Sequence, residues 1–239
     1  MVRFQVIRIP VLGLFAAWLV LVGTAAPGLA AEVYDLLFKT GTLDGISRTS
    51  VLDYERQVSA RDNQELAARE TGTISLSFGP DEMAELKFRQ GDKHRNVGSF
   101  PATVGNPMIM YFVETVIRDM ASTAGGSPYY IRNRVKAALV KQVPIREETI
   151  RINGHDVPAH SVTLHPFEGD PNRDRMHGFG DLALTITMSE QVPGWYYELK
   201  AEAGGEKGSG TDNTQGTAEK DDAPVYSSSI VLATSEAVD

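Results

Sequence analysis

The chain has 239 residues, with 31 acidic and 23 basic side chains, a net charge of −8 and no cysteine. The missing cysteine excludes disulfides, thiolate catalysis, cysteine-ligated zinc and thioether-linked haem. The acidic balance argues against general nucleic-acid binding, which draws its affinity from Lys and Arg contacts to phosphates.

The first 30 residues have the pattern of an export signal. Arg3 and Arg8 precede an uncharged, mostly apolar run over 11–22, and small residues at 27–30 suit cleavage after Ala30. The apolar run is shorter than the ~20 residues that a membrane-spanning helix needs, which disfavours a retained anchor. We therefore expect a signal peptide at 1–30 and one exported domain at 31–239, located in the periplasm or alternatively outside the cell. Without cysteine the signal is not a lipoprotein leader.

Alternation of apolar and polar residues predicts strands along most of the exported part. The first is expected around Tyr34, Leu36 and Phe38, which would share one face. The next three are expected over 52–58, 73–78 and 84–89.

A helical pair is predicted over 106–141. Asn106 is a good N-cap and Pro107 a good first helical residue, and an apolar stripe with helical spacing follows until Gly125-Gly126. Ser127 and Pro128 repeat the start signal, and the second helix should end before Pro144.

The second half returns to strands. Asn153-Gly154 predicts a two-residue hairpin turn between 149–152 and 155–165, and Pro193-Gly194 predicts a type II turn between strands over 182–189 and 195–201. Residues 204–222 contain no large apolar side chain and are expected to form a flexible hairpin loop before a last strand at 226–232.

These elements predict an α+β fold with about nine strands. Strands of that number present an apolar face of roughly 1,000 Å², whereas two helices shade only about 480 Å². Because large exposed apolar patches are rare, we expect a curved, mainly antiparallel sheet, half-barrel or barrel-like, with the two-helix insertion packed on or into it. Whether the interior is filled or holds a ligand cavity stays open.

Two groups of residues invite a metal-site interpretation. Asp170, Asn172, Asp174 and Asp181 imitate calcium-loop spacing, but Arg175 stands where a glycine is needed, and a short capped helix explains them better. His155, His160 and His165 alternate between strand faces and do not suit one ion. Neither group leads us to expect a resident metal or cofactor.

Common enzyme signatures are missing from the sequence. The chain has no Gly-x-Ser-x-Gly elbow, no His-Glu-x-x-His helix and no Walker-type loop, and Gly125-Gly126-Ser127 is explained by the helix start. The second helix carries a basic face that is a candidate contact for lipid head groups or an acidic partner, if it is not simply solvated. Its residues are Arg132, Arg134, Lys136 and Lys141.

The leading hypothesis is a non-catalytic periplasmic protein that binds an apolar small molecule, a lipid or a segment of an envelope protein inside the curved sheet. Membrane contact would be peripheral at most. The element order resembles the half-barrel carriers of lipoproteins and lipids in the bacterial envelope, without a diagnostic residue. The alternatives are an envelope scaffold that acts through its surface around a solid core and, third, a hydrolytic or metal-dependent enzyme. The candidate ligand-binding residues are Trp195, Tyr197, Phe88, Tyr54, Met108, Met110 and Met120.

Overall fold

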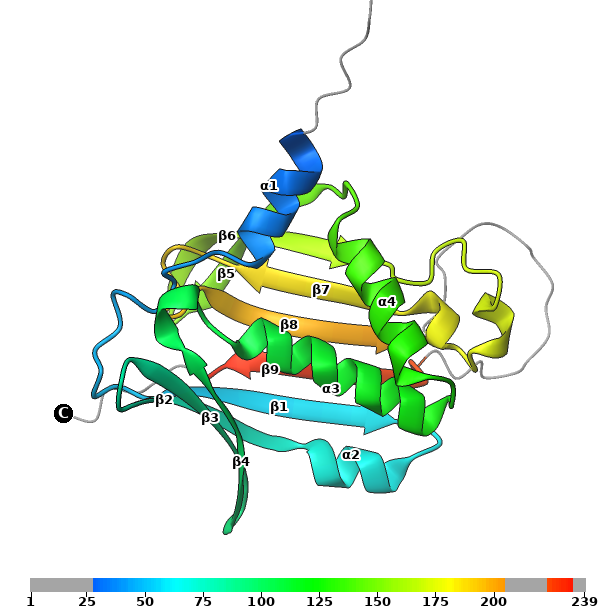
Figure 1. Ribbon diagram of the computed structural model, residues 1–239, viewed down its shortest axis with the longest axis horizontal. Coiled ribbons are helices and arrows are strands. Elements are labelled where there is room, and N and C mark those ends of the chain that lie inside the picture. The colour runs from blue at the N-terminus through cyan, green and yellow to red at the C-terminus, as the bar shows by residue number, and fades with distance from the viewer. Residues whose placement is uncertain (1–27, 205–222, 234–239) are drawn as a thin grey trace, which may run out of the picture.

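The fold is built on one antiparallel sheet of nine strands in the order β4-β3-β2-β1-β9-β8-β7-β6-β5 (Figure 1). The computed structural model describes residues 28–204 and 223–233, so most of the predicted signal peptide and almost all of the predicted 204–222 loop lie outside the described residues. The strands are β1 (Leu52–Ala60), β2 (Gly72–Gly79), β3 (Met83–Gln90), β4 (Lys93–Pro101), β5 (Ile145–Ile152), β6 (His155–Leu164), β7 (Ala183–Met188), β8 (Tyr196–Ala203) and β9 (Tyr226–Leu232).

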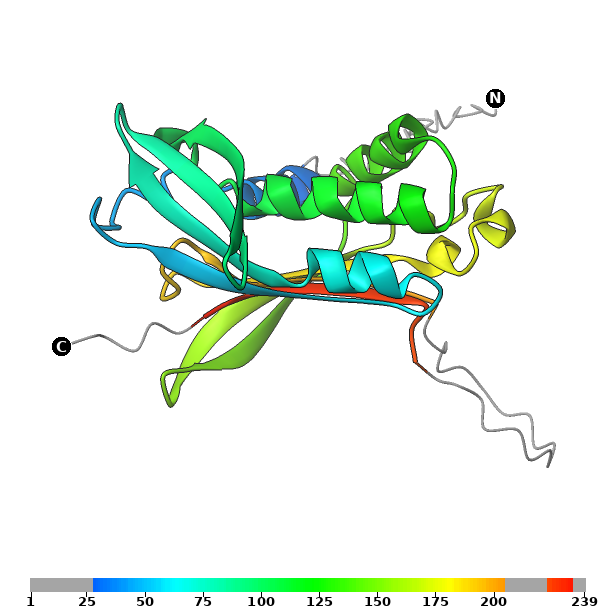
Figure 2. The same cartoon turned by 90° about the horizontal axis from the view of Figure 1, so that it is seen from below.

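The sheet is curved and does not close, because β4 and β5 have no strand partner on their outer sides within the described residues. The long helices cover one face of the sheet, and β2, β3 and β4 curl up toward them (Figure 2). The helices are α1 (Gly28–Leu37), α2 (Gln64–Glu70), α3 (Met108–Thr123) and α4 (Pro128–Leu139), with short 3-10 turns at Ala102–Val104, Arg173–Arg175 and Phe179–Asp181. The predicted fold class is therefore confirmed, in its open, half-barrel form.

Both predicted turns form between the expected strands. Asn153 and Gly154 adopt φ values of 50° and 80°, the positive values that a tight hairpin between β5 and β6 requires. Gly194 has φ of 77°, and the Trp195 N–H donates to the Val192 carbonyl across 2.9 Å, as in a type II turn.

The helical pair also forms where it was predicted. The Asn106 side chain accepts the Met108 N–H at 3.0 Å, so it caps α3 although the helix begins one residue later than expected. The amide of Asn106 also donates to the Tyr54 hydroxyl and to the Gly194 carbonyl. One side chain thus joins α3 to β1 and to the turn before β8.

The predicted strand at Tyr34, Leu36 and Phe38 is wrong. Tyr34 and Leu36 belong to α1, where Val33 and Leu37 are buried four residues apart, and Phe38 directly follows the helix. Tyr34 and Phe38 are also four apart and their rings touch, so the same residues fit a helical period as well as a strand period. None of the described helices combines the length and the apolar character needed to cross a membrane.

Two elements were missed. The short helix α2 is capped at its start by Asn63, whose side chain accepts the Leu66 N–H. Strand β4 lies at the sheet edge, and none of its residues is fully buried, so no alternating pattern marks it. The number of strands agrees with the prediction only because β4 replaces the strand expected at residues 34–38.

Candidate ligand-binding groove

Five of the seven predicted ligand-binding residues lie in the packed interior between sheet and helices. Met108, Met120 and Phe88 are buried, as is Tyr54, whose hydroxyl accepts from Asn106. The Trp195 ring is 4% exposed, and its Nε1–H donates to the Leu36 carbonyl at 3.1 Å. In this structure all five side chains belong to the buried core of the protein.

The other two residues, Tyr197 and Met110, are not fully buried. A bulge in β8 pairs Met188 with Tyr196 and leaves Tyr197 as the extra residue, so Tyr196 takes the interior position and donates to the Leu37 carbonyl. Met110 lies on α3 and is 49% exposed. The structure therefore does not gather the seven residues at one place.

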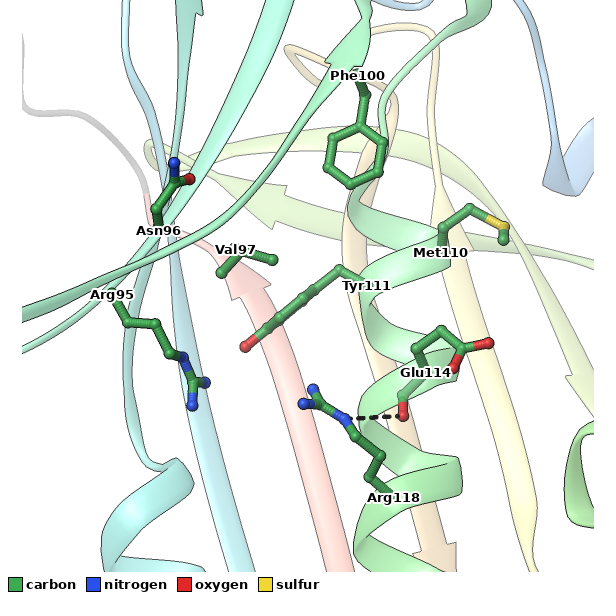
Figure 3. Close-up of a pocket in the computed structure, with 8 residues that line it drawn as sticks. All are labelled: Arg95, Asn96, Val97, Phe100, Met110, Tyr111, Glu114 and Arg118. Carbon is green, nitrogen blue, oxygen red and sulfur yellow. Dashed lines mark hydrogen bonds between the residues drawn. The ribbon is translucent and has the colours of Figure 1, made fainter. Parts of the chain in front are cut away.

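Met110 belongs to an open groove between strand β4 and helix α3, hereafter the β4–α3 groove. Its volume is about 390 Å³, and Figure 3 shows its lining side chains. They are Arg95, Asn96, Val97 and Phe100 from β4 and Met110, Tyr111, Glu114 and Arg118 from α3.

The β4–α3 groove continues into a second hollow of about 150 Å³, because Phe100 and Met110 line both. Apolar side chains dominate this second hollow, including Ile109 and Val104, which is 63% exposed. Together the two hollows offer a largely apolar path along the start of α3.

A bulge in the edge strand shapes the groove wall. Residue Leu86 pairs with Gly98 and Lys87 with Asn96, which leaves Val97 as the extra residue of β4. Bulges bend a strand and redirect its side chains, and here Val97 and Asn96 both reach the groove. Gly98 leaves room for the Phe100 ring, which would lie 3.0 Å from an added Cβ.

The groove is polar at one end and apolar at the other. Arg95 and Arg118 direct their guanidinium groups toward each other from β4 and α3, with the Tyr111 hydroxyl between them, whereas Phe100 and Met110 lie toward the opposite end (Figure 3). The carboxylate of Glu114 on the same helix is held by Arg132 in two hydrogen bonds of 2.9 and 2.7 Å. Hydrogen bonding to Arg132 lowers the pKa of Glu114, which keeps it ionised.

Beneath Tyr111 lies a buried charge network centred on Arg56. This side chain of β1 is fully buried and donates to Glu70 at 2.8 Å, Asp119 at 3.0 Å and the Tyr111 hydroxyl at 3.2 Å. The Tyr226 hydroxyl also donates to Asp119 at 2.8 Å. The network fixes α2 and α3 on the sheet and sets the position of Tyr111.

Burial and neighbouring charges shift the pKa values of the charged groups in this network in opposite directions. Burial would lower the pKa of Arg56, but the surrounding oxygens of Tyr111, Asp119, Tyr226 and Glu70 raise it, so the guanidinium stays charged. For Glu70, burial is outweighed by Arg56 and Arg69, which lower the pKa. Burial raises the pKa of Asp119 against the opposing effect of Arg56.

Three of the four calcium candidate residues, Asp170, Asn172 and Asp181, bond to protein groups in the structure. Asp170 is buried and accepts from the Tyr130 hydroxyl, from Arg134 at 2.6 Å and from the Asn172 N–H at 2.8 Å. Asp181 pairs with Arg173. Asp170 accepts the Asn172 N–H just before the 3-10 helix at Arg173–Arg175, so this helix begins two residues later than the Asp170-capped helix that the sequence favoured. In the described part of the chain, no three His, Asp or Glu side chains come together to hold a metal ion.

Replacing Asp170 by asparagine should destabilise the protein at neutral pH, with or without calcium. Burial would raise the pKa of Asp170, but bonds from Asn172, Tyr130 and Arg134 outweigh it and lower the pKa. A lowered carboxyl pKa gives stability that is present above the unfolded value and is lost as pH falls through the folded value. Urea unfolding of both proteins at several pH values, in calcium and in EDTA, checks this: the difference should narrow in acid, and a calcium-dependent difference would contradict it.

The three histidines that the sequence argued against as a shared metal site differ in their exposure. His155 and His165 are exposed, whereas His160 is half-buried on β6, paired with Met188 of β7. The Gly125-Gly126-Ser127 segment borders a separate open hollow of about 490 Å³ near Tyr130 and Arg175. Ser127 precedes α4 with Pro128 in its first turn, as the helix-start interpretation expects.

Half of the predicted basic face on α4 takes part in ion pairs. Arg132 pairs with Glu114 and Arg134 with Asp170, while Lys136 and Lys141 are exposed. The β3–β4 hairpin carries four basic side chains that were not predicted as a site: Lys87, Arg89, Lys93 and Arg95. Arg95 pairs with Phe88 and lines the β4–α3 groove, so it lies on the opposite face of the hairpin from Lys87 and Arg89.

Three comparisons place the chain among known proteins only loosely. No protein-family model matches it, and no curated protein does. Among solved structures, the crystal structure of the lipoprotein LppX from Mycobacterium tuberculosis has a TM-score of 0.32 and 12% sequence identity, covering 87% of this chain and 95% of that chain. A likeness of this degree assigns the chain to no family and identifies no ligand for it.

Proposed function

We propose that this protein is a non-catalytic, exported carrier that holds the apolar chain of a small amphiphile in the β4–α3 groove. The observation that carries the proposal is the apolar lining left open to solvent there. Met110 is 49% exposed and Val104 is 63% exposed, and both lie beside Phe100. Covering such side chains with a ligand is favourable, at about 0.8 kcal/mol for each buried CH₂ group.

The groove is favoured over the interior of the curved sheet as the place of binding. The interior side chains make specific hydrogen bonds, such as Tyr54 to Asn106 and Tyr196 to the Leu37 carbonyl, and would have to break them to admit a ligand. The β4–α3 groove needs no such rearrangement. Its volume of about 390 Å³ lies within the range of roughly 300–1,000 Å³ that is typical of small-molecule sites.

The dimensions of the β4–α3 groove also favour a ligand with one alkyl chain over a ligand with several. The volume is near the lower end of that range, and the groove narrows into the 150 Å³ hollow beside Val104. A single alkyl chain fits such a path, with its end near Val104 and Ile109. The proposed ligand class is therefore a single-chain amphiphile.

Displacement of a fluorescent fatty-chain probe tests the proposal. The protein should bind one probe molecule, and single-chain detergents below their micelle concentration should displace it in order of chain length, since each added methylene buries more apolar surface. Native mass spectrometry should show a 1:1 complex. Absence of both signals would overturn the carrier proposal, and a stoichiometric protein partner found by cross-linking would then support the scaffold alternative.

A further inference from the structure

The polar end of the β4–α3 groove contains two cationic side chains, of which one has no salt bridge among the described residues and the other has only a long one. Among the described residues, Arg118 forms no salt bridge, and its Nε makes only a long hydrogen bond of 3.4 Å to the Glu114 carbonyl. Arg95 lies 3.7 Å from Glu70, a carboxylate that Arg56 already holds at 2.8 Å. Two like charges that face each other across a groove repel unless an anion lies between them.

The nearby carboxylates neutralise this end of the groove only in part, because each is held more closely by another partner, as Glu70 is by Arg56. Glu114 is bound by both nitrogens of the Arg132 fork. Asp119 is buried and accepts from Arg56 and from the Tyr226 hydroxyl. The groove end is therefore locally positive in an acidic protein.

Tyr111 adds a neutral donor at the same place. Its side chain is buried, and its hydroxyl oxygen accepts a hydrogen bond from Arg56. A phenol has one proton to donate, and no described residue takes the proton of Tyr111. Because Arg56 occupies the oxygen from the protein side, the O–H is available to an acceptor in the groove (Figure 3).

We propose that the ligand carries an anionic head, a phosphate or a carboxylate, bound between Arg95 and Arg118 and hydrogen-bonded by Tyr111. Its chain runs past Val97 toward Phe100 and Met110. The inference rests on the proposed function, since it assigns the head group of the amphiphile held in that groove. Arginine is suited to this role because its planar fork matches the oxygens of phosphate and carboxylate.

Calorimetric titration with four probes separates the contribution of the head group to the binding affinity from that of the alkyl chain. Dodecyl phosphate, laurate and the neutral dodecyl maltoside are each used below their micelle concentrations, and inorganic phosphate serves as the free anion. The two anionic amphiphiles should bind about tenfold more tightly than the neutral one, the effect of one charge-assisted hydrogen bond. Raising the salt concentration should reduce this preference.

Variants of Arg118 test the assignment without disturbing the core, since this side chain is exposed. The substitution Arg118→Glu should weaken binding of the two anionic amphiphiles far more than binding of dodecyl maltoside, and so remove the preference for anionic heads, whereas Arg118→Lys should retain part of this preference. Lys141→Glu, just after α4, is the matched control, because it changes net charge equally at an exposed position outside the groove. Tyr111→Phe should weaken binding of the anionic amphiphiles more than binding of dodecyl maltoside.

The outcomes distinguish this inference from the carrier proposal. If charged and neutral amphiphiles bind with equal affinity, and Arg118→Glu does not change this, the proposal of an anionic head group is overturned and the carrier proposal stands. Inorganic phosphate binding as tightly as dodecyl phosphate would support the arginine site and contradict a role for the chain. If no probe binds, both proposals fail. Circular dichroism of each variant confirms that it is folded before titration.

Discussion

Replacing Arg56 by alanine should lower the free energy of unfolding by about 3–5 kcal/mol, the usual cost of removing one partner of a buried ion pair. The guanidinium is fully buried and binds Glu70 and Asp119 at 2.8 and 3.0 Å. Without it, two carboxylates would remain buried with no opposite charge between them. Urea unfolding at neutral pH measures the effect.

Two further variants show whether charge compensation is the cause. Arg56→Lys keeps the charge but loses the planar fork that serves both carboxylates. Its free energy of unfolding should therefore fall by less than that of Arg56→Ala. Replacing Arg56, Glu70 and Asp119 together by apolar residues of similar volume should recover much of the stability, since no unpaired charge is then buried. An Arg56→Ala protein within 1 kcal/mol of wild type, a threshold well below the usual cost, would contradict the role assigned to the network.

Substituting Met110 by glutamate should weaken binding of a single-chain amphiphile by about a hundredfold, because the ligand chain would have to lie against a charge or desolvate it. Met110 is half exposed and lines both hollows, so the folded state tolerates the change. Displacement of the fatty-chain probe measures affinity, and thermal unfolding measures stability. Affinity should fall while the melting temperature stays close to that of wild type.

The control for this prediction is Tyr129→Glu. Tyr129 is 70% exposed on α4 and lines no part of the β4–α3 groove. The Tyr129→Glu variant therefore loses a large exposed side chain and gains a negative charge, as Met110→Glu does. If Tyr129→Glu weakens binding as much as Met110→Glu does, the ligand is not held where we propose.

The elements that the sequence predicted best carry local signals of their own. The Asn153-Gly154 turn, the start of α4 at Pro128 and the cap supplied by Asn106 depend on backbone preferences of the residues concerned. Segment 34–38 was assigned wrongly because its apolar residues fit two periods at once. A local signal is decisive only where one period excludes the other.

The groove could not be predicted because its parts lack such signals. Strand β4 has no fully buried residue, and its bulge at Val97 depends on pairing with β3. Arg56 occupies an interior position of an otherwise apolar face, and only the arrangement of α2 and α3 reveals the carboxylates that compensate it. Met110 was singled out for its adaptable side chain, but its partners Phe100 and Arg95 come from the strand that was missed.

The most direct test of a ligand groove between β4 and α3 is to map where a ligand attaches. A dodecyl phosphate analogue with a diazirine near the end of its chain, photolysed with the protein and followed by peptide mass spectrometry, reports the residues beside that chain. We predict labels on Phe100, Val104, Ile109 and Met110, which line the groove and its extension, and their loss when unlabelled dodecyl phosphate competes. Labels concentrated on Trp195 and Tyr54 in the sheet interior, or scattered labels that do not respond to competitor, would contradict the account.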